Sequence, residues 1–131
     1  MSGEVVHPMA VKRSDRKNMM IDIDGCICEH VDNEEPEKMV TTPPLPGAVE
    51  SVNRWYEEGR YVCFITARTD EHREVTEAWL KAHGFKYHQI IFNKPRGGNY
   101  HYIDDLSVTA TRFNGNFGEL AQHTSQLLTS S

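Results

Sequence analysis

The sequence predicts an α/β domain built as a three-layer, doubly wound parallel sheet. Short apolar runs of strand length alternate with amphipathic stretches of helix length, which is the pattern of βαβ units. The strand runs are apolar throughout, as is typical of parallel strands buried on both faces. Glycines follow the helical stretches at the positions where helices commonly end. Together these observations favour a parallel sheet with helices on both faces.

The composition is that of a single globular domain. The chain has 131 residues, of which 38% are hydrophobic and 25% are charged, and this length suits one domain with a modest core. We expect residues 1–17 to form a polar N-terminal tail and residues 18–131 to form the domain. The net charge of −5 disfavours a nucleic-acid or membrane-surface binder, because both partners call for a basic protein surface.

The sequence also predicts a cytoplasmic protein with reduced cysteines. No apolar run approaches the roughly 20 residues of a membrane-spanning helix, and the N-terminal segment lacks the apolar stretch of a secretory signal. Cys26, Cys28 and His30 form a C-x-C-x-H cluster without a fourth ligand at zinc-site spacing. Cys63 lies inside an apolar strand. We therefore expect ordinary thiols rather than a zinc site.

The first half of the domain contains one strand, one loop and one helix. The apolar run over residues 19–23 predicts a buried strand. The acidic, proline-bearing stretch 29–44 predicts a long loop or flap, which in a compact domain is often functional. A helix is expected from Pro46 to the residue before Gly59. Its apolar residues fall on one stripe: Ala48, Val52, Trp55 and Tyr56.

The second half continues the alternation. Residues 61–65 predict a second strand, and a helix follows from Thr69 or Asp70 to the residue before Gly84. Residues 88–92 predict a third strand and residues 100–103 a fourth. Residues 117–128 predict a terminal helix.

Polar residues follow the strands at corresponding positions. In parallel sheets the carboxyl ends of the strands meet at one edge, where ligands bind. Clustered carboxylates repel one another unless a cation joins them, and hard oxygen ligands suit Mg²⁺. The residues concerned are Asp22, Asp24, Thr66, Lys94, Asp104 and Asp105.

These residues resemble, in type and order, the four motifs of the haloacid dehalogenase (HAD) superfamily. The match consists of Asp22-Ile23-Asp24-Gly25, Thr66, Lys94 and Asp104-Asp105, and it covers residues 18–105. The resemblance implies the HAD-like, Rossmannoid fold and phosphoryl-transfer chemistry. Neither gap between the motifs has room for a cap domain, so a small capless phosphatase-like member is expected.

The resemblance also implies roles for the first two motifs. Asp22 would be the nucleophile that forms an aspartyl-phosphate. Asp24 would protonate the leaving oxygen and then activate water, and its backbone carbonyl would bind Mg²⁺. Thr66 would hydrogen-bond a phosphoryl oxygen. The turn from Thr66 through Ala67 to Arg68 is the expected substrate-binding segment.

The remaining motifs carry charge. By resemblance, Lys94 would offset the charge of nucleophile and phosphate, and Asp104, with Asp105, would hold Mg²⁺. The metal set is therefore Asp22, Asp24, Asp104 and Asp105. From the residues alone, Arg68 has two interpretations. It clamps an anionic substrate, or it pairs with a nearby glutamate, Glu71 or Glu74.

One departure from the family concerns the connection between motifs III and IV. Only five residues separate Lys94 from Tyr100, whereas a crossover between parallel strands generally needs a dozen or more. A helix of the usual fold should be missing, which would leave one sheet face thinly covered. We therefore expect a homo-oligomer that covers the sheet or the site, or a monomer in which the C-terminal segment 113–128 folds back over the bare face.

The function expected is a Mg²⁺-dependent phosphohydrolase acting on a small-molecule phosphomonoester, with a sugar phosphate as the leading substrate class. A polynucleotide 3′-phosphatase is an alternative that the negative charge disfavours. A phospho-acceptor domain has related groups, but its acid pair comes first and a lone aspartate follows. Here a D-x-D comes first and a D-D last. A non-catalytic HAD-fold binding module is a further alternative.

Overall fold

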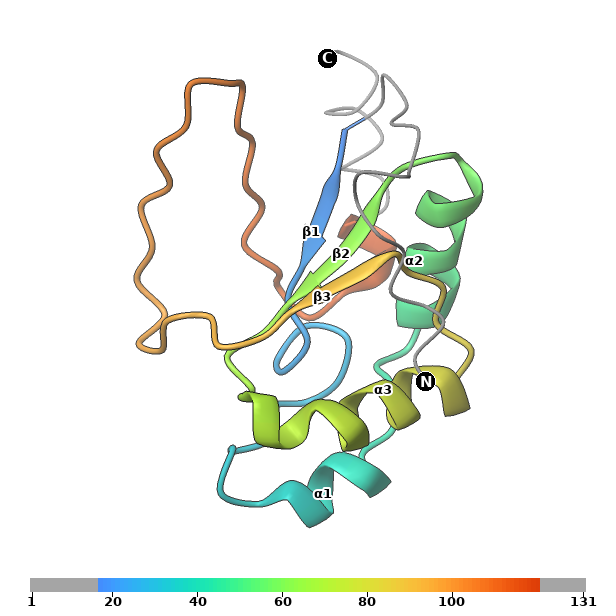
Figure 1. The fold of residues 1–131 in the computed structure, drawn as a ribbon. Helices are drawn as coiled ribbons and strands as arrows, with labels where there is room; N and C mark the ends of the chain where they lie inside the picture. Colours follow the sequence, from blue (N-terminus) through green and yellow to red (C-terminus); the bar gives the residue numbers. More distant parts are fainter. Residues whose placement is uncertain (1–16, 121–131) are drawn as a thin grey trace.

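The computed structural model describes residues 17–120. They contain a three-stranded parallel sheet in the order β1-β2-β3, formed by Met19–Ile21, Val62–Ile65 and Gln89–Ile91 (Figure 1). The helices are α1 (Pro36–Thr41), α2 (Ala48–Glu57) and α3 (Arg73–Ala82), and a 3₁₀ turn, η2 (Asp70–His72), leads into α3. The alternation of strands and helices expected from the sequence is therefore present, and the parallel sheet is confirmed.

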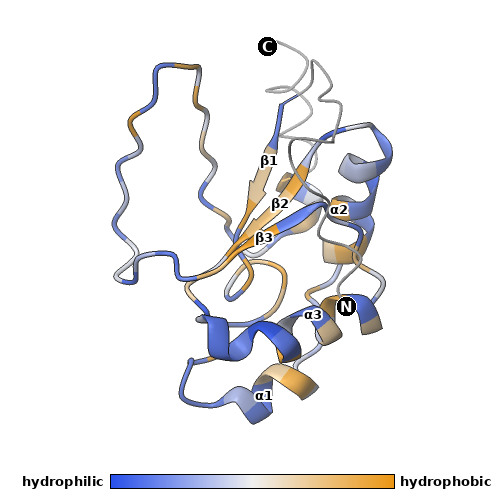
Figure 2. Ribbon diagram, viewed as in Figure 1, coloured by the Kyte–Doolittle hydropathy of each residue, from blue (hydrophilic) through white to orange (hydrophobic). Residues whose placement is uncertain are grey.

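One face of the sheet carries the core. In the strand register Ile21 lies beside Phe64, and Phe64 beside Ile90, and all three are buried. Helices α2 and α3 supply the residues that pack with them: Ala48, Val52, Trp55, Trp79 and Leu80. Figure 2 shows the apolar colour concentrated on the strands and on parts of the adjoining helices. The strand order runs in one direction, so two right-handed crossovers place α2 and α3 on the same face.

The opposite face is less covered. Met20 and Ile91 point to this side, one residue out of step with the core positions. They are 55% and 36% exposed. The third layer of the expected doubly wound architecture is not seen over these two positions in residues 17–120. The thin covering that the short connection after Lys94 predicts is present at the two edge strands.

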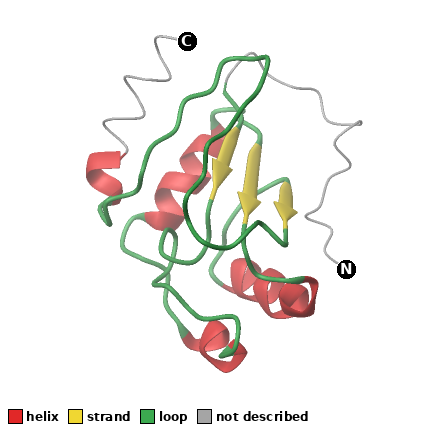
Figure 3. Ribbon diagram, turned by 90° about the vertical axis from the view of Figure 1, so that its left-hand side faces the viewer, coloured by secondary structure: helices red, strands yellow, loops and turns green. Residues whose placement is uncertain are grey.

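The fourth strand predicted at residues 100–103 is wrong for the described chain. Residues 94–112 contain no helix or strand and run as a long open loop on the β1 side of the sheet (Figures 1 and 3). The cause is the short connection from Lys94, which contains no crossover helix to return the chain to the start of a new parallel strand.

Two further differences concern helices. The segment expected to be a loop contains α1, which starts with Pro36 in the first turn and buries Met39 completely. The predicted terminal helix begins at Phe117 and is helical to Leu120, and its remainder, 121–128, lies outside the described residues. The predicted tail 1–17 also lies outside them except for residue 17. None of the described helices has the length and apolar content needed to cross a membrane.

Candidate active site

The two acids of the first motif lie just beyond the carboxyl end of β1. The strand ends at Ile21, two residues earlier than predicted. Ile23, between the two acids, is completely buried and anchors the segment in the core. Gly25 then turns the chain with φ of +81°, a value that favours glycine, and its N–H donates to Cys28 O at 2.9 Å. Asp22 and Asp24 are therefore held on either side of a fixed apolar anchor.

Asp24 is held by Arg68. Arg68 Nε donates to Asp24 Oδ2 at 2.9 Å and Nη2 donates to Oδ1 at 2.8 Å. Nη1 donates to Thr76 Oγ1 at 2.9 Å. Arg68 is only 1% exposed, so this is a buried two-point ion pair with a fixed geometry. The structure thus answers the question that the sequence left open, because Arg68 pairs with a carboxylate 44 positions away and not with Glu71 or Glu74.

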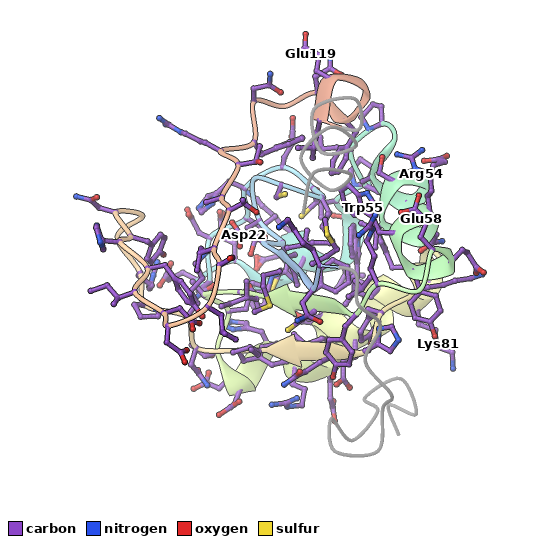
Figure 4. All side chains as sticks on the ribbon, turned by 90° about the horizontal axis from the view of Figure 1, so that it is seen from above. Asp22, Arg54, Trp55, Glu58, Lys81 and Glu119 are labelled. Carbon is purple, nitrogen blue, oxygen red and sulfur yellow. The ribbon has the colours of Figure 1, made fainter. Side chains whose placement is uncertain are left out.

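Asp22 is the more accessible of the two acids. Its side chain is 43% exposed, against 12% for Asp24. Lys94 Nζ lies 3.8 Å from Asp22 Oδ1. Burial raises the pKa of Asp22 above its ordinary value, and the charge of Lys94 acts in the opposite direction. Figure 4 labels Asp22 near the centre of the molecule, seen from above.

Backbone hydrogen bonds place Lys94 beside the second motif. Lys94 N donates to Thr66 O at 2.9 Å, and Asn93 N donates to Arg68 O at 2.8 Å. These bonds continue the contact between β2 and β3 past the ends of both strands. Thr66 is completely buried, and its Oγ1 accepts from Arg68 N at 3.1 Å. The structure therefore brings Asp22, Asp24, Thr66 and Lys94 to one end of the sheet.

Sequence reasoning missed three residues that support this site. Asn33 Nδ2 donates to Ala67 O at 3.0 Å, and His72 Nε2 lies 2.9 Å from Asn33 O. The acidic segment before α1 is thus tied to the turn that follows β2. Thr76, the third, accepts from Arg68. Only His72 had a sequence signal, because the spacing from Thr69 is that of a capping box, which the structure contains.

The predicted metal ligands do not gather within one chain. Asp104 and Asp105 lie in the exposed loop. Asp104 Oδ1 accepts from Leu106 N at 3.0 Å and Oδ2 from Tyr102 Oη at 2.8 Å. These hydrogen bonds lower the pKa of Asp104. In residues 17–120 no group of three or more His, Cys, Asp or Glu side chains is placed to hold a metal ion. A single described chain therefore does not fit the Mg²⁺ site that the resemblance implies.

Both cysteines of the C-x-C-x-H cluster are free and removed from solvent to different degrees. Burial is the main cause that raises the pKa of Cys26 and of Cys28 to about 12, and the neighbouring aspartates add to it. Cys28 is completely buried, and Cys26 is partly buried.

Comparison with known proteins shows the family to which this chain belongs. The model of the family described as "PITM 1-3, LNS2 domain" matches residues 19–104, a range that begins with β1 and ends at Asp104. The chain belongs to this LNS2 domain family. Its fold is HAD-like, as the resemblance in the four motifs predicts. A "Putative nucleotidase" of Bacillus cereus is 31% identical over 67 residues, which are 50% of this LNS2 domain chain and 35% of the relative. The chain thus spans about a third of that relative's length.

Solved structures with the same fold share little sequence. A structure from Vibrio cholerae superposes with a TM-score of 0.58 at 21% identity, covering 87% of the LNS2 domain chain and 98% of the other. A chain from the "Pnkp1/Rnl/Hen1 RNA repair complex" gives a TM-score of 0.54 at 16% identity, covering 70% of this chain and 30% of the other. At these identities the similarity concerns the fold.

Proposed function

We propose that this LNS2 domain is a phosphohydrolase that cleaves phosphomonoesters through an aspartyl-phosphate on Asp22. The observation that carries the proposal is the pairing of a half-exposed carboxylate, Asp22, with Lys94 Nζ at 3.8 Å, beside a second carboxylate clamped by Arg68. An exposed carboxylate can reach phosphorus, and a cation beside it lowers the cost of bringing an anionic phosphate close.

The first step forms the covalent intermediate. A carboxylate oxygen of Asp22 attacks phosphorus, and the bond from phosphorus to the leaving oxygen breaks. The leaving oxygen takes a proton from Asp24, which enters this step as the neutral acid with its protonated oxygen released from Arg68. In the second step water attacks phosphorus, gives its proton to Asp24, and breaks the bond to Asp22. Inorganic phosphate leaves and both aspartates return to their starting states. Arg68 orients the Asp24 carboxyl through its remaining bond when Asp24 is protonated, and through both bonds when it is ionised.

Mg²⁺ is part of the proposal as the cofactor that the family resemblance implies. Bound, it would neutralise charge on the transferring phosphoryl group. Asp22 and the Asp24 carbonyl would supply ligands from the first motif, and Asp104 with Asp105 would supply the rest. This ligand set is not assembled in the single chain, so no step above depends on it.

Two substrate classes compete. A sugar phosphate is the first, as expected for a small capless member. A nucleotide or a 3′-phosphorylated nucleic acid is the second, favoured by the similarity to a putative nucleotidase and to a chain of an RNA repair complex. The net charge of −5 favours small substrates over long nucleic acids. A non-catalytic module would bind phosphate esters without releasing phosphate.

The test is phosphate release from a panel of sugar phosphates, nucleotides and 3′-phosphorylated oligonucleotides, with and without millimolar Mg²⁺. Asp22→Asn should reduce turnover to background on every substrate. Asp24→Asn should lose about 10²- to 10⁴-fold on alkyl phosphates and less on aryl phosphates, which leave without protonation.

Asp70→Asn is the matched control, because Asp70 is an exposed aspartate on η2 that pairs only on the surface with Arg73. It should keep full activity. Activity that survives in Asp22→Asn would contradict the nucleophile. Wild-type protein that binds phosphate esters and releases none would favour the binding module.

A further inference from the structure

An exposed aromatic ring lies next to the proposed nucleophile. The centre of the Tyr100 ring is 4.7 Å from Lys94 Nζ, and the same Nζ is 3.8 Å from Asp22 Oδ1. The ring centre therefore lies at most about 8.5 Å from that carboxylate oxygen, which is the sum of the two distances. Neither step of the proposed reaction uses Tyr100, so the ring is open to another role at the site.

The chain holds the ring in this place. Gly97 and Gly98 have φ of +114° and +70°, values that are open to glycine, and they turn the chain between Lys94 and Tyr100. The Tyr100 hydroxyl donates to Pro95 O at 2.5 Å, which closes the turn. The hydroxyl and the ring face each have a partner, so Tyr100 has a defined position at the start of a long loop.

The ring remains available to a ligand. Tyr100 is 53% exposed, and Lys94 Nζ lies over one face of the ring. The hydroxyl proton is already donated to Pro95 O. Tyr100 therefore offers a ligand a flat apolar face and no free hydrogen-bond donor. Such a face suits a flat aromatic group better than a polyol, because stacking needs only a second π-face, whereas sugar hydroxyls need polar partners.

One small molecule can occupy both positions. The proposed reaction brings phosphorus to about 3 Å from the Asp22 carboxylate oxygen. A flat ring stacked on Tyr100 lies on the same side of Lys94 as a phosphate that this cation attracts. A spacer the size of one sugar joins the phosphate to the ring. This is the composition of a nucleoside monophosphate.

We propose that Tyr100 is a specificity-determining residue, which stacks against the nucleobase of a nucleoside monophosphate whose phosphate lies at Asp22. The inference deepens the proposed function and rests on it for the position of the phosphate. It narrows the substrate class from phosphomonoesters in general to those that carry a flat aromatic ring.

The experiment compares ligands that differ only by the base. Isothermal titration calorimetry measures binding of ribose 5-phosphate and of 5′- and 3′-adenosine monophosphate to the Asp22→Asn variant, which should bind without turnover. The better of the two nucleotides should bind about 5- to 100-fold more tightly than the sugar phosphate, as one stacked base allows. Adding Tyr100→Ala should remove this preference and change the affinity for ribose 5-phosphate by less than about twofold.

Two control variants test the cause. Tyr100→Leu keeps an apolar side chain without a π-face and should lose the preference as Tyr100→Ala does. Ile103→Ala should keep the preference, because Ile103 is an 86% exposed apolar residue in the same loop. Equal losses for the nucleotide and ribose 5-phosphate in Tyr100→Ala would mean that Tyr100 only positions Lys94, and would overturn the proposal. A wild-type ring without nucleotide preference, or a preference that survives in Tyr100→Leu, overturns it as well.

The outcomes separate this proposal from the proposed function. If wild-type protein releases no phosphate from any substrate, the proposed function fails, and the binding comparison still decides the role of Tyr100. If wild-type protein releases phosphate from sugar phosphates and nucleotides alike, and Tyr100→Ala alters both rates equally, the proposed function stands and the stacking role fails.

Discussion

Arg68→Met removes the cation that holds Asp24. The variant keeps an unbranched side chain of similar length and deletes the guanidinium, which makes two bonds to Asp24 and one to Thr76. Because Arg68 is 1% exposed and the Asp24 side chain is 12% exposed, water cannot replace these bonds. Breaking a buried ion pair from one side costs about 3–5 kcal/mol, since the remaining charge is left uncompensated.

The loss is large relative to the whole stability of a domain. A chain of this size has a free energy of unfolding of about 5–15 kcal/mol. With a urea dependence of about 2 kcal/mol per molar, a loss of about 4 kcal/mol lowers the midpoint of urea unfolding by about 2 M. Equilibrium urea unfolding at pH 7, followed by tryptophan fluorescence, measures this shift.

Two further variants test the cause. Arg73→Met is the matched control, because Arg73 is 46% exposed and its ion pairs lie at the surface. Its guanidinium also lies 4.4 Å from the centre of the Phe92 ring, and methionine keeps an apolar contact there. It should lose about 1 kcal/mol or less. Asp24→Asn combined with Arg68→Met removes both charges and should recover about 2 kcal/mol of the single-variant loss. A loss below about 1 kcal/mol in Arg68→Met, or strict additivity in the double variant, would refute the reasoning.

Three smaller predictions concern packing and thiols. Phe117→Ala should cost about 3 kcal/mol in urea unfolding, because Phe117 is 3% exposed within the core; a loss under about 1 kcal/mol would mean that this ring is not part of the folded core in solution. Gly47→Ala should lower the melting temperature more than Gly84→Ala. Both glycines have positive φ, but only at Gly47 would an added Cβ lie 3.1 Å from another atom, Phe117 Cβ. Equal losses of melting temperature would contradict a role for this close contact. Native Cys26 and Cys28, with pKa values of about 12, should react slowly with Ellman's reagent at pH 8 and at full rate in denaturant; rapid reaction of both in the native protein would contradict their burial.

The sequence determined the elements whose signal is local. The apolar runs around Met20, Phe64 and Ile90 predict three strands, and all three form within a residue or two of the expected limits. Such runs are informative because a parallel strand covered on both faces is apolar at nearly every position, a pattern that can be read within a few residues. The residues of the family motifs could also be recognised from the sequence. Acids, a threonine and a lysine that follow strands come together because the topology of a parallel sheet brings those ends to one edge.

Only the tertiary structure decided which partner each charge takes and which segment joins the sheet. Arg68 had nearer acids in sequence, and its pairing with Asp24 follows from folding that brings positions 44 apart into contact. Residues 100–103 have the composition of a strand, yet composition cannot supply a connection long enough to reach a free edge in the same chain. Strand formation needs a neighbour to accept its hydrogen bonds, so an apolar segment becomes a strand only where the chain, or a second chain, brings it to an open edge.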